Sequence, residues 1–310
     1  MTTPISSGPA IKELALRMPP KEAKIPLKKI PGTAKGFADF SLEEQIVFKE
    51  WKEIIDNTFA LFGFDPLDLP PFVHRKFLLV KGGVEAQIFS VNHLSDNSQT
   101  KYGIAFDRTV PFALWIRDNL KKLSFPFKRR DISLSFRAES TRTGRLNGFY
   151  QADIDTVGRN LPLTCDAECI TVLVSALSQI KSVPSFEVYL NHIEIPKHLI
   201  KKAGFTNLEE ALRVIDKLDK TPPEQIVAEL CQLEPSVSCK EIEQIVSVCS
   251  FRGSFKDFQQ MSLSLERSSV YIEQVAKVIS LVQKAGVNPD LIKFAPGIVR
   301  GLNYYTGIVF

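Results

Sequence analysis

The sequence predicts an α+β protein, with an antiparallel sheet flanked by helices and one long segment that is helical throughout. Two observations lead to this class. Residues 131–139 and 149–157 alternate apolar and polar side chains with the two-residue period of a strand, and a polar, glycine-containing stretch joins them. Residues 194–285 instead carry apolar side chains at helical spacing in several successive runs. We therefore expect a strand pair in the first part of the chain and a helical insertion in the second.

Composition sets outer limits on the class of protein. The chain has 310 residues, 44% of them hydrophobic and 24% charged, with a formal net charge of +4, which is ordinary for a globular protein. No apolar run approaches the roughly 18 residues that a membrane-spanning helix needs, and no apolar signal core opens the sequence. A cytoplasmic location without membrane attachment is expected. Five cysteines without a C-x-x-C motif predict free thiols, and no metal site is predicted.

The chain is expected to fall into four segments. Residues 1–34 form a basic, proline-containing extension, interpreted as a solvated tail rather than a targeting peptide because it has one arginine and two acids. Residues 35–193 form the first part of a core, 194–285 the helical insertion domain, and 286–310 the return to the core.

A long helix is expected to begin at Ser41, because Ser41 and Glu44 have the spacing of a capping box, and to end near Gly63. Its apolar stripe comprises Ile46, Trp51, Ile54, Ile55 and Phe59. Short strands are expected at 78–80, 87–91, 103–109 and 185–190, with helices at 111–123 and 164–181, the latter capped by Thr164. The insertion is expected to contain helices at about 197–204, 207–218, 222–232, 239–249 and 264–285, followed by strand pattern over 291–305.

Chemistry-bearing side chains gather in the predicted strands. Because side chains alternate faces along a strand, Phe149, Gln151, Asp153 and Asp155 would share one face of their strand. If the strands lie in one sheet, its open face would carry Asp107, Thr109, Arg137, Glu139, Gln151 and Asp155. Acids on such a face suit an ammonium or imidazole group, and arginines suit phosphate or carboxylate. The simpler interpretation is a solvated face with salt bridges. Interleaved aromatic residues and additional arginines, namely Tyr304, Tyr305, Arg142, Arg145 and Arg300, favour a ligand site.

Four segments resemble motifs of histidyl-tRNA synthetases, which are class II aminoacyl-tRNA synthetases. They are Lys35–Phe40 (KGFADF), Phe106–Phe112 (FDRTVPF), Phe136–Gly158, and Val299–Phe310 (VRGLNYYTGIVF). The last is the most specific. The resemblance implies a class II synthetase-like fold, a homodimer, and a ligase of protein biosynthesis that activates histidine with ATP and transfers it to tRNA(His). Family members continue with a third motif and an anticodon-binding domain, so a partial chain with poor activity of its own is expected.

The resemblance also implies roles for individual residues. Asp107, Thr109 and Gln151 would hold the histidine α-ammonium, and Asp155, Tyr304 and Tyr305 would surround the imidazole. Arg137 would grip the ATP α-phosphate, Glu139 would lie beside the adenine amino group, Phe149 would stack on the ring, and Arg145 would reach the distal phosphate. Arg300 would place a fixed cation at the α-phosphate, so the expected catalytic residues are Arg300 and Arg137. Mg²⁺ would bridge the ATP phosphates.

Some positions depart from the family pattern. Asn303 stands where the family has aspartate, and Phe37 and Ala38 replace threonine and arginine. An alternative interpretation is therefore a non-catalytic paralogue that acts as a regulatory subunit or sensor. Retention of Arg137, Glu139 and Arg300 argues against it, because a protein without catalysis has no need of phosphate-binding arginines and an adenine-side acid.

Overall fold

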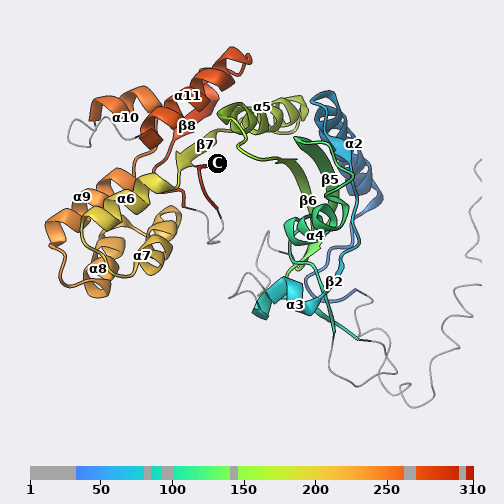
Figure 1. Ribbon diagram of the computed structural model, residues 1–310, viewed down its shortest axis with the longest axis horizontal. Coiled ribbons are helices and arrows are strands. Elements are labelled where there is room, and N and C mark those ends of the chain that lie inside the picture. Colours follow the sequence, from blue (N-terminus) through green and yellow to red (C-terminus); the bar gives the residue numbers. More distant parts are fainter. Residues whose placement is uncertain (1–32, 80–84, 93–100, 140–145, 262–269, 300–304) are drawn as a thin grey trace, which may run out of the picture. The chain divides into compact units, whose positions relative to one another are not determined.

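The structure is a computed structural model that describes residues 33–79, 85–92, 101–139, 146–261, 270–299 and 305–310. The chain divides into two compact units. The first unit comprises Met1–Gln45, Pro70–Ala113 and Leu134–Gln151, and the second comprises Ile46–Leu69, Leu114–Ser133 and Ala152–Phe310. The elements are labelled in Figure 1.

Helix α2 (Leu42–Leu61) begins where the capping box predicts. The backbone N–H of Ser41 donates to Glu44 Oε2 at 2.8 Å, and the N–H of Glu44 donates to Ser41 Oγ at 3.2 Å. Gly63 follows the helix with a φ of +77°, a conformation that glycine adopts without strain. The apolar stripe lies on this helix as predicted, but only its C-terminal end is buried: Phe59 is 6% exposed, whereas Ile46 is 69% exposed.

A small antiparallel sheet lies in the first unit, with strands β2 (Phe72–His74), β4 (Tyr102–Ile104) and β3 (Ser90–Val91) in that order. The strand expected at 78–80 is wrong, because Leu78 ends helix α3 (Arg75–Leu78) and is fully buried there. The strand expected to reach Thr109 is also too long. Helix α4 (Thr109–Asn119) begins at that residue, since the Asp107 carboxylate accepts the N–H of Val110 and caps the helix.

The strand pair of the prediction is β5 (Phe127–Phe136) and β6 (Gly148–Val157), which are neighbours in a sheet ordered β1-β5-β6. Strand β1 (Asp65–Pro66) pairs in parallel with β5. Strand β5 begins four residues before the expected position and ends at Phe136, so Arg137 and Glu139 lie just beyond it. The N–H of Arg137 still donates to the carbonyl of Asn147 at 2.8 Å, which continues the pairing past the strand end.

Three further strands meet in the second unit. Strand β7 (Val188–His192) lies between β8 (Ile292–Phe294), to which it is parallel, and β9 (Ile308–Val309), to which it is antiparallel. Helices α5 (Leu163–Gln179) and α11 (Val270–Lys284) pack against this sheet through one buried apolar cluster. The predicted Thr164 cap is wrong, because α5 begins at Leu163 and has no side-chain cap. The strand pattern expected over 291–305 shrinks to β8, with residues 300–304 outside the described part.

The helical segment is close to the prediction. It contains α6 (Glu194–Lys202), α7 (Leu208–Ile215), α8 (Pro223–Leu233) and α9 (Cys239–Cys249), with the 3-10 turn η4 (Asp216–Asp219) after α7. Asn207 and Ser238 cap α7 and α9 with their side chains. Helix α10 (Phe255–Met261) was missed. The division of the chain at residues 34, 193 and 285 stays a prediction.

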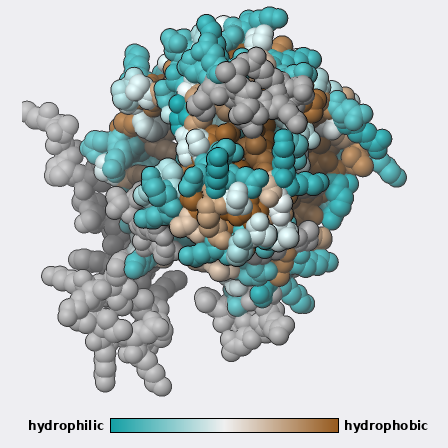
Figure 2. All heavy atoms as spheres, turned by 90° about the vertical axis from the view of Figure 1, so that its left-hand side faces the viewer, coloured by the Kyte–Doolittle hydropathy of each residue, from teal (hydrophilic) through white to brown (hydrophobic). Residues whose placement is uncertain are grey.

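The helices of this segment share a core of aliphatic side chains, among them the fully buried Ile215, Ile226, Leu230 and Ile242. Hydrophilic side chains cover most of the face shown in Figure 2, with hydrophobic residues visible between them. In the described part of the chain, no helix combines the length and the apolar content that crossing a membrane requires.

Candidate functional site

Backbone hydrogen bonds bring three of the resembling segments together in the first unit. The carbonyl of Gly36 accepts the N–H of Asn147 at 2.7 Å, which joins the segment Lys35–Phe40 to the start of β6. The carbonyl of Ala105 accepts the N–H of Phe136 at 3.4 Å, which joins the segment before α4 to the end of β5. Residues 31 and 111 positions apart in the sequence thus lie side by side, as a composite site requires.

Phe37 fixes the first of these segments against the strands. Its ring centroid lies 6.2 Å from those of Phe89 and Phe136, at tilted angles. A Cβ atom on Gly148 would come within 2.6 Å of the Phe37 ring, so this phenylalanine needs glycine opposite it. The departure from the family threonine at this position is therefore matched by close packing, and it leaves the segment attached to β6.

Arg137 is held in place from two sides. Its Nε donates to the carbonyl of Phe106 at 3.1 Å, and its guanidinium carbon lies 5.0 Å from the centroid of the Phe149 ring. The contact with Phe149 is a cation–π interaction, which orients the guanidinium plane. Among the described residues its two Nη nitrogens have no hydrogen-bond partner. Arg137 can therefore present a fork of donors to an anion.

Two of the predicted ammonium ligands, Asp107 and Thr109, differ in exposure and in the element to which they belong. Asp107 is 6% exposed, and its Oδ1 accepts the N–H of Val110 at 3.2 Å as the cap of α4. Thr109 is the first residue of that helix and is exposed. The expectation that the two share a strand face is wrong, because the chain turns into a helix between them.

Gln151 carries the most informative atom of the site. Its Oε1 is buried and accepts no hydrogen bond from any described residue. A buried carbonyl oxygen without a donor costs on the order of 1–3 kcal/mol, so such atoms are rare unless a ligand or water completes them. Gln151 lies in β6, two residues from Phe149, and the two side chains emerge on the same side of the strand. A hydrogen-bond donor from a ligand or from water would complete Gln151 Oε1.

Asp155, the predicted imidazole ligand, belongs to a buried ion-pair network in the second unit. Its Oδ2 accepts Arg129 Nε at 2.7 Å, and Arg129 Nη1 donates to Asp131 Oδ2 at 2.9 Å. Arg129 and Asp131 are both buried, while the Asp155 side chain is 29% exposed. One oxygen edge of Asp155 is therefore committed to an arginine. The network was missed because Arg129 lies in a basic run.

That run, Lys128–Arg130, has the composition that is most often a solvated face, but its side chains are paired. Lys128 Nζ donates to Glu168 Oε1 at 2.8 Å, and Arg130 Nε donates to Asp56 Oδ1 at 2.7 Å. All three cations thus have carboxylate partners, because β5 begins early enough to include them.

The remaining predicted site residues are only partly described. Glu139 is half-buried, and its N–H donates to the carbonyl of Arg137 at 2.9 Å. Tyr305 is 38% exposed, ahead of β9. Arg142, Arg145, Arg300 and Tyr304 lie outside the described residues, as does Asn303. Their roles stay predictions.

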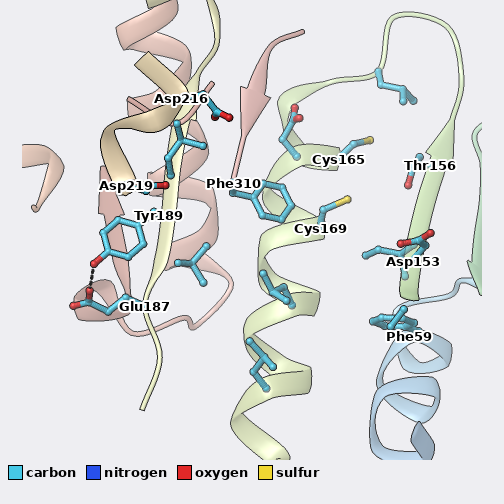
Figure 3. Close-up of a pocket in the computed structure, with 18 residues that line it drawn as sticks. Phe59, Asp153, Thr156, Cys165, Cys169, Glu187, Tyr189, Asp216, Asp219 and Phe310 are labelled. Atoms are coloured by element: carbon cyan, nitrogen blue, oxygen red, sulfur yellow. Dashed lines mark hydrogen bonds between the residues drawn. The ribbon is translucent and has the colours of Figure 1, made fainter. Parts of the chain in front are cut away.

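A pocket of about 820 Å³ lies in the second unit, between β6 and α5 on one side and β7 and Phe310 on the other (Figure 3). Its charged lining residues are all acidic: Asp153, Asp166, Glu187, Asp216 and Asp219. In it, Tyr189 donates to Glu187, and burial together with nearby carboxylates raises the pKa of Cys169 to about 12. Phosphates would be repelled here, so this pocket is not the predicted ATP site. Asp153 lines this pocket, although strand alternation placed it on the same face as Gln151.

Magnesium would have to be held mainly by the nucleotide. In the described part of the chain, no three histidine, cysteine or acidic side chains are grouped so that they could hold a metal ion. Mg²⁺ in nucleotide sites commonly uses one or two carboxylates together with substrate phosphates.

The fold and the arrangement of segments define a class II synthetase-like protein. A crystal structure of histidyl-tRNA synthetase from Nostoc sp. PCC 7120 matches 90% of this chain and 64% of its own length, with a TM-score of 0.78 and 25% sequence identity. An ATP phosphoribosyltransferase regulatory subunit/histidyl-tRNA synthetase from Bacillus halodurans matches 92% of this chain with a TM-score of 0.75. At 18% identity, this second likeness concerns the fold alone.

Sequence comparison specifies the family within that class. The family model for histidyl-tRNA synthetase matches residues 36–310. The histidine–tRNA ligase of Finegoldia magna is 33% identical over 287 residues, which are 90% of this chain and 65% of the relative. That of Clostridium acetobutylicum is 31% identical, with the same coverage. The chain belongs to the histidyl-tRNA synthetase family, and it spans about two thirds of the length of these relatives.

Proposed function

We propose that the protein is a histidine–tRNA ligase of the cytoplasm, which activates histidine with ATP to histidyl-adenylate and transfers it to tRNA(His). Family membership supports the reaction type. The observation that carries the proposal in the structure is the buried, unpartnered Oε1 of Gln151. An α-ammonium group offers three donors to such an atom, and it would remove the cost of leaving the oxygen unpaired.

Asp107 would complete the ammonium subsite. Its carboxylate supplies the negative charge that a buried ammonium requires, and the hydrogen bond of Oδ1 to the start of α4 holds it in place. Gln151 supplies a neutral acceptor from β6. The two residues belong to the same compact unit, which supports a shared role. Thr109 would add a hydroxyl acceptor at the start of α4.

The phosphate side of the site would rest on Arg137. Its Nε is bound to the Phe106 carbonyl, so the Nη donors are oriented before ATP arrives. The carboxylate of histidine would attack the α-phosphate, and charge would build up on the phosphate oxygens as pyrophosphate leaves. Arg137, joined by Arg300, would stabilise that charge, and Arg145 would bind the leaving phosphates. This is catalysis by orientation and fixed charge, without a covalent enzyme intermediate.

The adenine and the imidazole would use the remaining residues. The Phe149 ring would stack on adenine, with the cation–π contact to Arg137 setting its position, and Glu139 would accept from the adenine amino group. Asp155, with Tyr304 and Tyr305, would bind the imidazole. The ion pair with Arg129 would keep the Asp155 carboxylate charged and in place. When bound with ATP, Mg²⁺ would neutralise phosphate charge.

The first test is histidine binding to this chain by isothermal titration calorimetry. Gln151→Ala removes the unpartnered acceptor, so we expect histidine affinity to fall about tenfold or more, which corresponds to roughly 1.4 kcal/mol. Affinity for ATP should change far less. The matched control is Gln259→Ala, on the exposed side of α10. Equal losses for histidine and ATP, or no binding of histidine by the unsubstituted chain, would contradict the assignment.

Catalysis is tested separately by histidine-dependent exchange of pyrophosphate into ATP. Exchange that requires histidine and is lost in Arg137→Ala supports the ligase. Histidine binding without any exchange would instead favour the second candidate, a regulatory subunit or sensor. A solved neighbour whose title names both a regulatory subunit and a histidyl-tRNA synthetase shares the fold, so the fold is compatible with either candidate.

A homodimer is part of the proposal. Helix α2 carries a row of apolar side chains that remain exposed in the single chain: Leu42 at 81%, Ile46 at 69% and Val47 at 45%. Clustered exposed aliphatic residues on one helix are typical of a protein–protein interface. A second copy of the chain, as the family resemblance implies, would cover them.

A further inference from the structure

Two cysteines meet where helices α8 and α9 connect. The Sγ of Cys231, in the last turn of α8, donates to the Sγ of Cys239, the first residue of α9, at 2.9 Å. The two residues are eight positions apart, and helices α8 and α9 pack against each other. No spacing rule in the sequence marks them, because they do not form a C-x-x-C motif.

The backbone around the two sulfurs is firmly held. Leu230 and Ile242, one residue before Cys231 and three after Cys239, are fully buried in the core of the helical segment. The connecting loop is tied by Glu234, whose carboxylate accepts from the N–H and the hydroxyl of Thr206. The short distance therefore follows from packed helices and a tied loop.

The sulfur atoms of Cys231 and Cys239 also belong to residues that are accessible to solvent. Cys239 is exposed and Cys231 is half-buried, whereas Cys249 is fully buried. A disulfide needs a sulfur–sulfur distance of about 2.05 Å, so a bond here requires only a small side-chain rotation from 2.9 Å.

We propose that Cys231 and Cys239 form a redox modification site, a dithiol that is converted reversibly to an intramolecular disulfide by low-molecular-weight disulfides. The site lies outside the residues assigned to histidine and ATP. Oxidation would link the end of α8 to the start of α9 covalently.

The reaction proceeds in two exchanges. The Cys239 thiolate attacks one sulfur of the small disulfide, forms a mixed disulfide and releases one small thiolate. Cys231 then loses its proton to solvent, and its sulfur attacks Cys239 Sγ, which forms the protein disulfide and releases the second small thiolate. Two protein thiols are oxidised, and one small disulfide is reduced to two small thiols.

The order of attack follows from the exposure of the two cysteines and from the direction of the hydrogen bond between them. Cys239 is the more exposed sulfur and accepts the hydrogen bond, while Cys231 donates it. That hydrogen bond raises the pKa of Cys231 to about 11, so Cys231 keeps its proton at neutral pH. The first attack therefore falls to Cys239, and Cys231 resolves the mixed disulfide.

The test is exposure of the folded 310-residue chain to oxidised glutathione, followed by thiol counting and peptide mass mapping. We expect two of the five thiols to disappear with a loss of two hydrogens in mass, a linked peptide pair that contains Cys231 and Cys239, and full reversal by dithiothreitol. A chain that retains all five thiols, or that gains only glutathionyl groups, would overturn the proposal.

Single substitutions separate the two roles. Cys231→Ser should stop at one glutathionyl group on Cys239, because the resolving thiol is missing. Cys239→Ser should abolish the loss of the thiol pair. Cys165→Ser, on α5, is the matched control and should leave the internal disulfide unchanged. Circular dichroism confirms that each variant is folded. An internal disulfide that persists in Cys239→Ser would show that another pair is responsible.

Discussion

At the scale of single residues, the stability of the described fold is expected to depend strongly on the buried charge of Arg129. It is fully buried between the carboxylates of Asp131 and Asp155. Arg129→Met should destabilise the chain by about 3–5 kcal/mol, because two carboxylates would lose the buried cation that compensates them. Urea unfolding followed by circular dichroism measures the loss. Arg117→Met, in the exposed pair with Asp118, is the control and should leave unfolding unchanged. Equal behaviour of the two variants would contradict a structural role for the network.

The same residues show what the sequence could and could not predict. Arg137, Phe149 and Gln151 were placed near one another by strand alternation and by the family resemblance, and the structure brings the segments that carry them into contact. Arg129 was missed, because a basic run is usually solvated and only the tertiary fold supplies its partners. Asp107 was identified as a site residue, but its capping of α4 depends on where a helix begins, which the alternation obscured.

At the scale of elements, the loop between α8 and α9 is stabilised by one ionised side chain, that of Glu234. Hydrogen bonds from Thr206 and then Ser236 lower the pKa of Glu234 to about 2, from an ordinary value of 4.5. A lowered pKa means that the folded state favours the charged form. The stabilisation is therefore complete above about pH 4.5 and is lost as the pH falls towards 2.

Glu234→Gln should consequently lower the melting temperature at pH 7, and the difference from the unsubstituted chain should shrink as the pH falls from 4.5 to 2. Thermal unfolding followed by circular dichroism across this range provides the measurement. Glu50→Gln, on the exposed side of α2, should show no such pH dependence. A difference that stays constant with pH would rule out the hydrogen-bonded carboxylate as its source.

Elements were predicted best where periodicity is long and caps are present. The capping box of α2 and the helices α8 and α9 were placed within one or two residues. The failures are short elements, such as α3 and α10, in which a few residues satisfy either periodicity and burial decides. The apolar stripe of α2 was predicted by its spacing, but the spacing does not show which part is covered: Phe59 is buried, whereas Ile46 is exposed.

At the scale of the whole molecule, that exposed half of α2 predicts self-association. The chain has a mass of 34.8 kDa, so a homodimer should elute with about twice that mass in size-exclusion chromatography with light scattering. Ile46→Glu places a charge among the apolar residues and should shift the protein to the monomer. Lys49→Glu, on the same helix, is the control and should preserve the dimer. A monomeric unsubstituted chain at micromolar concentration would contradict the proposal.

The close fit of Phe37 over Gly148 has a consequence for sequence variation. The ring occupies the volume that any side chain at position 148 would need. The sizes of the side chains at the two positions should therefore be correlated. A relative with a small residue at position 37 has room for a methyl group at position 148, and a relative with an aromatic ring at position 37 does not. Coordinated change at these positions, 111 residues apart in the chain, would record that pressure between them.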